Sequence, residues 1–240
     1  MFYSLPVMHP RRLAIFALSL TLISARAEEA ASSFPGLKSV AVPEDLAPYP
    51  GKLSYDPALT KVLNEKLKVE EGAPDAQRLV STKIDREKET RYLIDFDSGP
   101  SADPAFVVTD EKTGAVLGSV GGESLIVPGN GFLYVSGRAN RLHQEQAKYT
   151  IRDGKLVEIA QPFSYVGLKS KAKVPLKLLA KKDGGEVIAN VPEGESLEVV
   201  LRDGEHLLIK TNFGLLGWWK ANTSVIADNA EIEGIYYAGD

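Results

Sequence analysis

Short apolar runs separated by turn-forming residues constrain the fold of this chain more than any other feature of its sequence. Asn130 and Gly131 join one pair of runs, and Asp153 and Gly154 join another. Such dipeptides accept the positive φ angles that tight hairpins require. A third pair flanks residues 110–114, and successive hairpins form an antiparallel meander. The strands are expected at residues 92–96, 105–109, 115–120, 125–127, 132–135, 149–151 and 156–159.

The arrangement of this meander stays open between a single open sheet, a sandwich and part of a propeller. No internal repeat recurs along the chain, and a propeller is built from repeated blades. The sequence therefore disfavours the propeller and does not choose between the other two.

One helix is expected ahead of the strands. Asp56 is a good N-cap residue, and Pro57 suits the first helical position. Apolar residues recur at helical spacing over residues 59–67, and Pro74 ends the segment. We interpret it as a packing helix rather than a partner-binding one, within a proline-rich tether that covers residues 28–75.

The first residues indicate export. Arg11 and Arg12 give a positive start, an apolar run covers residues 13–23, and Ala-Arg-Ala occupies residues 25–27. This order of charge, apolar core and small residues is typical of a secretory signal peptide. The apolar run is much shorter than the roughly 20 residues of a spanning helix. We predict removal of residues 1–27 and a periplasmic or extracellular location.

Composition excludes several chemistries. The chain has no cysteine, which excludes disulfides and thiolate catalysis. Loss of Arg11, Arg12 and Arg26 with the signal takes the formal net charge from −4 to −7. An acidic chain is a poor partner for nucleic acid, because neutralising phosphates needs a surplus of Lys and Arg.

The C-terminal region has its own pattern of short strands and glycine turns. Leu197, Val199 and Leu201 alternate so as to share one face of a strand, and Gly194 lies at the turn before them. Residues 214–218 read Gly-Leu-Leu-Gly-Trp. Strands separated by glycine turns suit a small closed barrel. The expected strands cover residues 174–178, 186–191, 197–201 and 207–210.

These strands, the Gly194 turn and the Gly-x-x-Gly-Trp ending resemble the bacterial SH3-like family over residues 172–224. The family occurs in exported bacterial proteins, often attached to cell-wall enzymes. The resemblance implies a closed β-barrel that binds peptide-containing cell-envelope material. Apolar residues continue past it, so we expect a last strand within residues 225–240 that docks on a domain.

The predicted fold class is mainly β. An antiparallel β-meander domain precedes a small SH3-like β-barrel, and one short helix lies near the N-terminus. The predicted segments are a signal peptide at 1–27, the tether at 28–75, the β domain at 76–168, the barrel at 169–224 and the docking strand at 225–240.

Two adjacent tryptophans are the leading ligand-binding candidates. Neighbouring residues of a strand point to opposite faces, so Trp218 and Trp219 cannot share one. We predict Trp218 in the core and Trp219 as an exposed stacking platform, while burial of both is the competing interpretation. Phe213 and His206 are expected to line the same end of the barrel.

No catalytic or metal-binding constellation stands out. His143 and His206 fall in different predicted domains, so they do not form part of one triad. Asp95, Asp97 and Asp103 match a calcium loop only in part and are interpreted as a strand end running into a turn. We therefore expect no enzyme activity, no metal and no cofactor.

A basic stretch interrupts the acidic chain. One interpretation is binding of an anionic polymer or a lipid headgroup. The favoured interpretation is edge protection, because lysines along an exposed strand deter pairing with other chains. The residues are Lys169, Lys171, Lys173, Lys177, Lys181 and Lys182.

The leading hypothesis is an exported, non-catalytic binding protein. Its expected partners are a protein or cell-wall peptide such as peptidoglycan, without nucleic acid and without a membrane span after signal removal. One alternative is a purely structural two-domain scaffold, and a second is an envelope hydrolase targeted by its C-terminal domain. The oligomeric state stays open.

Overall fold

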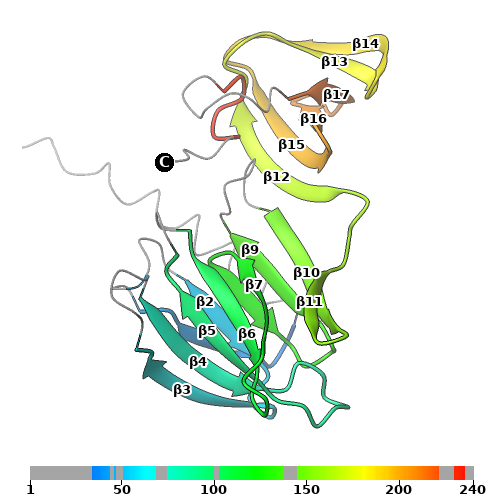
Figure 1. Cartoon of the computed structure of the whole chain (residues 1–240). Coiled ribbons are helices and arrows are strands. Elements are labelled where there is room, and N and C mark those ends of the chain that lie inside the picture. The colour runs from blue at the N-terminus through cyan, green and yellow to red at the C-terminus, as the bar shows by residue number, and fades with distance from the viewer. Residues whose placement is uncertain are drawn as a thin grey trace, which may run out of the picture. The chain divides into compact units, whose positions relative to one another are not determined.

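The protein is built from β-strands. The computed structural model describes residues 34–43, 46, 51–68, 75–99, 103–137, 145–221 and 230–235. Within these ranges there are seventeen strands in three open sheets and no helix (Figure 1). Accordingly, nothing in the described part is a helix long and apolar enough to cross a membrane. The predicted signal peptide and His143 lie outside the described residues.

The first sheet is a five-stranded meander in which each strand pairs antiparallel with the next along the chain. Its strands are β3 (Thr60–Lys66), β4 (Ala76–Thr82), β5 (Tyr92–Asp97), β6 (Ala105–Asp110) and β7 (Val116–Gly121).

The second sheet has six strands in the order β1-β2-β8-β9-β10-β11. Its one parallel pairing joins β2 to β8 and places Leu53 opposite Leu125. The strands are β1 (Lys38–Ala41), β2 (Lys52–Tyr55), β8 (Ser124–Val127), β9 (Leu133–Gly137), β10 (Glu145–Arg152) and β11 (Lys155–Glu158).

These two sheets share one hydrophobic core and so form a sandwich. Phe96 and Phe106 pack edge to face at its centre, with ring centroids 5.3 Å apart. Leu53, Leu125 and Leu133 of the second sheet belong to the same buried cluster. The three predicted hairpins are confirmed as β6–β7, β8–β9 and β10–β11, but they are divided between two sheets. The expected continuous antiparallel meander is therefore wrong, and of the arrangements that the sequence left open the sandwich is the one that forms.

The predicted helix at residues 59–67 is also wrong. Asp56 does accept a hydrogen bond from the backbone N–H of Ala58 at 2.8 Å, as an N-cap residue would. Only one turn forms, however, and the chain continues as β3, with Val62 opposite Val80 of β4. The residues expected on one helical face form a strand instead, because β4 supplies hydrogen-bond partners for their backbone N–H and C=O groups. The prediction of a tether at residues 28–75 is wrong as well where the chain forms β1 and β2.

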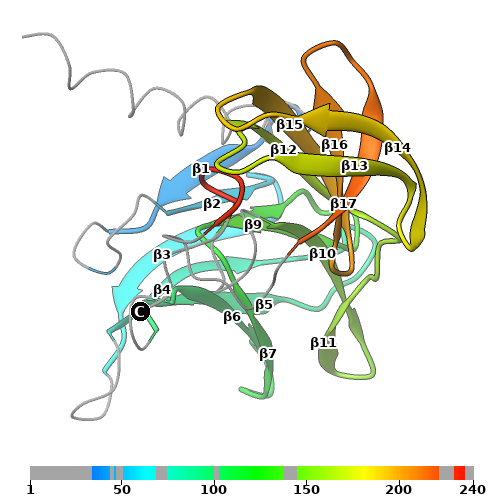
Figure 2. The same ribbon diagram turned by 90° about the horizontal axis from the view of Figure 1, so that it is seen from above.

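The third sheet contains the predicted C-terminal strands but is not a closed barrel. It runs in the order β12-β15-β16-β17-β13-β14, and its outermost strands, β12 and β14, do not pair with each other. β13 and β14 form a hairpin at one end of it (Figure 1, Figure 2). The strands are β12 (Ser164–Lys171), β13 (Leu176–Lys181), β14 (Gly184–Val191), β15 (Ser196–Asp203), β16 (His206–Thr211) and β17 (Leu216–Lys220).

A segment from the C-terminal end of the chain fills the inner face of this sheet. Ile232 and Ile235 are fully buried with Leu207 and Ile209 in a second hydrophobic cluster. Ala172, just after β12, forms an isolated bridge with Ile232. Residues 230–235 therefore complete the core, although no strand forms within them.

Candidate binding face of the C-terminal sheet

The two tryptophans lie on opposite faces of β17, as expected, but with their roles exchanged. Trp219 pairs with the fully buried Leu207 and packs against the inner core. Trp218 pairs with the half-buried Leu208 and therefore belongs to the outer face. Because Ile232 fills the inner side, the open aromatic surface belongs to Trp218.

Trp218 lies within a row of apolar side chains that crosses the whole sheet. Each strand contributes one residue, and each residue stands opposite the next in the pairing register. Residues directly opposite each other on neighbouring strands share a face, so the row lies on the outer side. This apolar row comprises Tyr165, Leu201, Leu208, Trp218, Leu179 and Val187.

Two β-bulges create the apolar row. Strict alternation would place Leu201 on the same face as Val199, in the core. A register shift between these residues instead leaves Val199 fully buried and brings Leu201 opposite Leu208. A similar shift places an extra residue in β14 and brings Val187, two positions from the inward-facing Ala189, opposite Leu179 on the outer face. The sequence pattern missed this surface because an extra residue in a strand reverses every later position.

The apolar row is exposed to solvent at both ends. Tyr165 on β12 is 57% exposed and Val187 on β14 is 50% exposed, while the four residues between them are half-buried. Gly167 has a positive φ of 61°, and a Cβ atom there would collide with the Tyr165 ring. A register shift between Tyr165 and Leu168 marks a further bulge here, and glycine at this position lets the tyrosine lie flat along its own strand.

Charged residues border the apolar row on both sides. On one side Lys169, Glu198 and Lys210 stand opposite one another on three strands, and Lys210 Nζ lies 3.1 Å from Glu198. On the other side Lys182 pairs with Asp203, and its ammonium group lies 5.6 Å from the centroid of the Trp218 ring. The outer face thus combines an apolar centre with polar margins.

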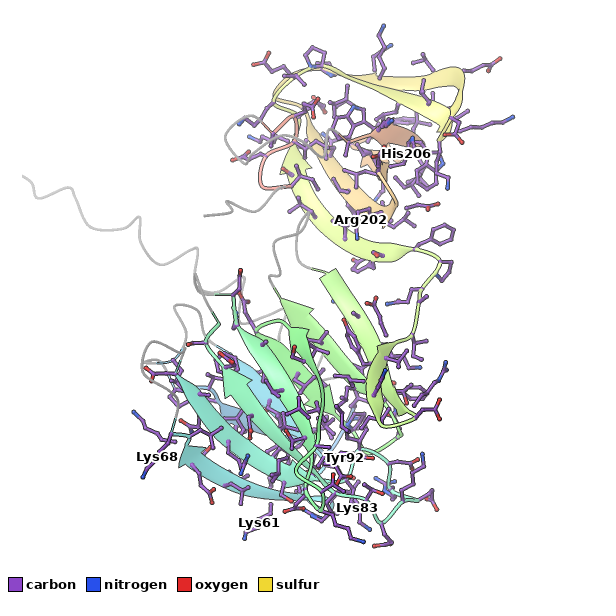
Figure 3. All side chains as sticks on the ribbon, viewed as in Figure 1. Lys61, Lys68, Lys83, Tyr92, Arg202 and His206 are labelled. Carbon is purple, nitrogen blue, oxygen red and sulfur yellow. The ribbon has the colours of Figure 1, made fainter. Side chains whose placement is uncertain are left out.

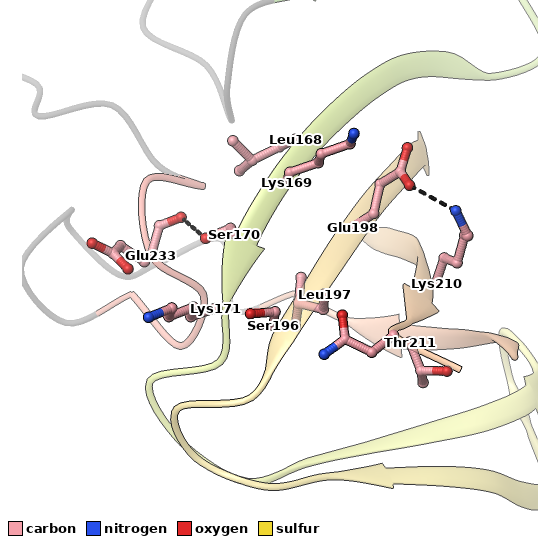
Figure 4. A pocket seen from close by; sticks show the side chains of 11 residues that line it. Leu168, Lys169, Ser170, Lys171, Ser196, Leu197, Glu198, Lys210, Thr211 and Glu233 are labelled. Atoms are coloured by element: carbon pink, nitrogen blue, oxygen red, sulfur yellow. Dashed lines mark hydrogen bonds and ion pairs between the residues drawn. The ribbon is translucent and has the colours of Figure 1, made fainter. Parts of the chain in front are cut away.

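A hollow of about 700 Å³ opens at the first of these margins (Figure 4). Its lining includes Lys169, Lys171, Ser196, Glu198, Lys210 and Glu233. Lysines outnumber carboxylates among these residues, and the hollow can therefore attract an anionic group.

The other two predicted ligand residues lie apart from each other. His206, labelled in Figure 3, stands opposite Lys220. It lies two positions along β16 from Leu208 and so shares the outer face with Trp218. Phe213 lies in the turn between β16 and β17 and is 89% exposed. The structure thus brings Trp218 and His206 to one face, while Trp219 lies behind them and Phe213 at a loop tip.

Two of the three aspartates considered for calcium, Asp95 and Asp97, serve the fold. Asp95 accepts two hydrogen bonds from the Arg78 guanidinium, at 2.9 and 3.1 Å, and this contact raises the pKa of Arg78. Asp97 accepts a hydrogen bond from the backbone N–H of Gly99 at 2.8 Å. Over the ranges the structure describes, no three His, Asp or Glu side chains gather as metal ligands would.

Comparison with known proteins gives no relative: no family model, no curated protein and no solved structure matches the chain. A functional inference therefore rests on the chemistry of the outer face alone.

Proposed function

We propose that this is an exported, non-catalytic binding protein whose C-terminal sheet binds peptide-containing cell-envelope material, or a partner protein, on its outer face. The apolar row is the observation that carries the proposal. Its two aromatic members, Tyr165 and Trp218, are of the residue types that dominate binding energy at interfaces.

The physical reason lies in what covers each face of the sheet. Ile232 and Ile235 already occupy the inner face, so a ligand cannot bind there without unfolding the core. The outer face keeps an apolar strip beside polar margins, and burying that strip against a ligand releases water from it. Trp218 and Tyr165 have few rotatable bonds, so ordering them on binding costs little entropy.

A purely structural role is the second candidate. It is supported by the packing of Trp219 with residues 230–235, because these residues of the same chain already cover the inner face of the C-terminal sheet. The two candidates differ in the outer face alone. A scaffold needs Trp218 only for stability, whereas a binding protein needs it for affinity.

Sedimentation with purified peptidoglycan tests the proposal. We expect the mature protein to co-sediment and Trp218→Ala to lower the affinity by about tenfold or more, as for a central aromatic contact. Val116→Ala is the control, since Val116 is 67% exposed on β7 of the sandwich. Equal binding by wild type and Trp218→Ala would contradict the proposal.

The same samples separate binding from hydrolysis. Release of soluble fragments from peptidoglycan would favour the hydrolase alternative, and retention of intact material agrees with binding alone. If peptidoglycan is not bound, the experiment is repeated with an envelope-protein extract and crosslinking, again comparing wild type with Trp218→Ala. Binding to neither material leaves the scaffold as the better description.

A further inference from the structure

The ammonium group of Lys182 lies on the outer face of the C-terminal sheet, close to the indole of the apolar row. Its Nζ is 5.6 Å from the centroid of the Trp218 ring, inside the range of about 6 Å at which an aromatic face attracts a cation. The same Nζ forms an ion pair with Asp203 of β15. An aromatic ring and a carboxylate therefore hold one primary ammonium group on the proposed binding face.

Lys182 can leave this place without disturbing the core. It lies in the two-residue turn between β13 and β14, outside both strands. Gly184, at the end of this turn, has a positive φ of 127°, and nothing lies within 4 Å of a Cβ atom placed there. The Lys182 side chain is 38% exposed, and ion pairs so open to water contribute little to stability. Displacing the Lys182 ammonium therefore costs little.

The neighbouring charges at this margin favour a cation. Asp203 stands opposite His206, and His206 stands opposite Lys220. Lys220 is neutralised by Glu205, whose Oε2 lies 3.2 Å from the lysine Nζ. When Lys182 leaves, the Asp203 carboxylate loses the ammonium group that neutralises it, and a carboxylate near an aromatic ring attracts another cation.

We propose that Lys182 occupies the site of a ligand ammonium group, and that the ligand carries a primary amine on an aliphatic chain, as the lysine side chain of a peptide does. This inference rests on the proposed function and names its ligand class. The ligand ammonium displaces Lys182 from Asp203 and the Trp218 ring, while its aliphatic chain covers Leu208, which stands opposite Trp218. One ammonium replaces another, so the polar contacts are kept and the newly buried apolar surface supplies the affinity.

Fluorescence anisotropy with two serine peptides tests the ligand class. Both are labelled at the N-terminus; the probe carries one lysine, which has its only primary amine, and the second peptide carries acetyl-lysine instead. We expect the probe to bind about tenfold or more tightly, because acetylation removes the charge and keeps the aliphatic chain. Rising salt should weaken the binding of the probe alone.

Protein variants test the displacement, and the two partners of the ion pair have opposite expected effects. Lys182→Ala should strengthen probe binding about three- to tenfold, because the protein's own ammonium no longer occupies the site. Asp203→Asn should weaken it about tenfold, since the ligand loses its carboxylate partner. Lys181→Ala and Asp183→Asn are the matched controls, because they make the same changes in net charge at the exposed neighbours of Lys182. Far-ultraviolet circular dichroism verifies that each variant is folded.

Acetylated peptidoglycan distinguishes two sources of the amine. Acetic anhydride converts the free primary amines of the purified material to amides. Reduced co-sedimentation of the wild type after this treatment assigns the amine to the cell-wall material. Unchanged co-sedimentation, together with tight binding of the lysine probe, assigns it to a lysine of a partner protein.

The outcomes separate this inference from the proposed function. If both peptides bind alike and acetylation leaves Trp218-dependent binding of peptidoglycan unchanged, the ammonium site is wrong and the binding face stands. Weaker or unchanged probe binding by Lys182→Ala overturns the displacement. Loss of peptidoglycan, envelope-protein and peptide binding together overturns both the inference and the proposed function.

Discussion

The sandwich and the C-terminal sheet treat their outer faces differently. In the first sheet of the sandwich, a row of paired residues crosses all five strands through Glu65, Arg78, Asp95, Val107 and Ser119. The Arg78–Asp95 pair satisfies the centre of that row within the protein. The equivalent row of the C-terminal sheet is apolar, and its ends are exposed.

This difference shows which region satisfies its outer face with its own contacts and which region leaves that face open to a partner. A row whose centre is an internal ion pair gains little from a partner, because binding would break a contact that already exists. An exposed apolar row gains free energy when a partner covers it. The sandwich is therefore the self-contained region, and the C-terminal sheet is the region that we expect to bind.

The largest expected effect is on the sandwich core. Phe106→Ala should reduce the free energy of unfolding by about 3–5 kcal/mol, because it leaves a cavity beside Phe96. Both tryptophans of the chain lie in the C-terminal sheet, so their fluorescence reports that sheet alone. Circular dichroism should shift to lower denaturant while the fluorescence transition stays in place. A common shift of both signals would show that the two cores unfold as one.

Ile232→Ala makes the complementary test of the C-terminal core. We expect a loss of about 2–5 kcal/mol, since Ile232 is fully buried. Here tryptophan fluorescence should shift in urea titrations, with Glu233→Gln, an exposed neighbour, as the control. An unchanged transition in Ile232→Ala would mean that residues 230–235 do not hold this core.

A smaller effect is expected from breaking the polar row. Asp95→Asn leaves Arg78 without its carboxylate and should cost about 1.5–3 kcal/mol, the usual range for hydrogen bonds to charged groups. Glu65→Gln, at the exposed end of the same row, should change stability by less than about 0.5 kcal/mol. Equal effects from the two changes would argue against the ion pair as the centre of the row.

The smallest effect concerns Glu231. Burial raises the pKa of this carboxyl, and its Oε2 is buried without a hydrogen-bond partner. The folded state therefore holds the proton more tightly than the unfolded state, so stability falls as pH rises through the unfolded and then the folded pKa. Glu231→Gln should flatten this decline above the ordinary glutamate pKa of 4.5 in melting experiments. A steeper decline in the variant would reverse the sign of the proposed effect.

The sequence predicted local features of the fold better than their assembly. Hairpin positions followed from Asn130-Gly131 and Asp153-Gly154, because turn chemistry acts between neighbouring residues. The helix prediction failed near Asp56 because capping residues also suit an isolated turn, and pairing with a distant strand decided the outcome. The prediction of a closed barrel was wrong for a related reason, since closure depends on whether the two edge strands, β12 and β14, pair with each other.

The candidate site was predicted only in part. Adjacency of Trp218 and Trp219 correctly indicated opposite faces, but not which face the C-terminal segment would fill. The apolar row could not be predicted, because the bulge after Val199 leaves no mark in the spacing of hydrophobic residues. A surface created by irregular strands can be predicted only when the pairing register is known. The register depends on both strands of a pair and cannot be read from one of them.

The parallel pairing of β2 with β8 has a consequence for the folding rate. Lys52 pairs with Ser124, and the entire meander from β3 to β7 lies between them in the chain. Closing so long a loop costs conformational entropy before the two strands gain any contact. Their pairing is therefore slow, and the polypeptide stays unfolded for longer. For the export that we propose, a precursor that folds slowly would remain threadable, and this is the state that a narrow secretion channel accepts.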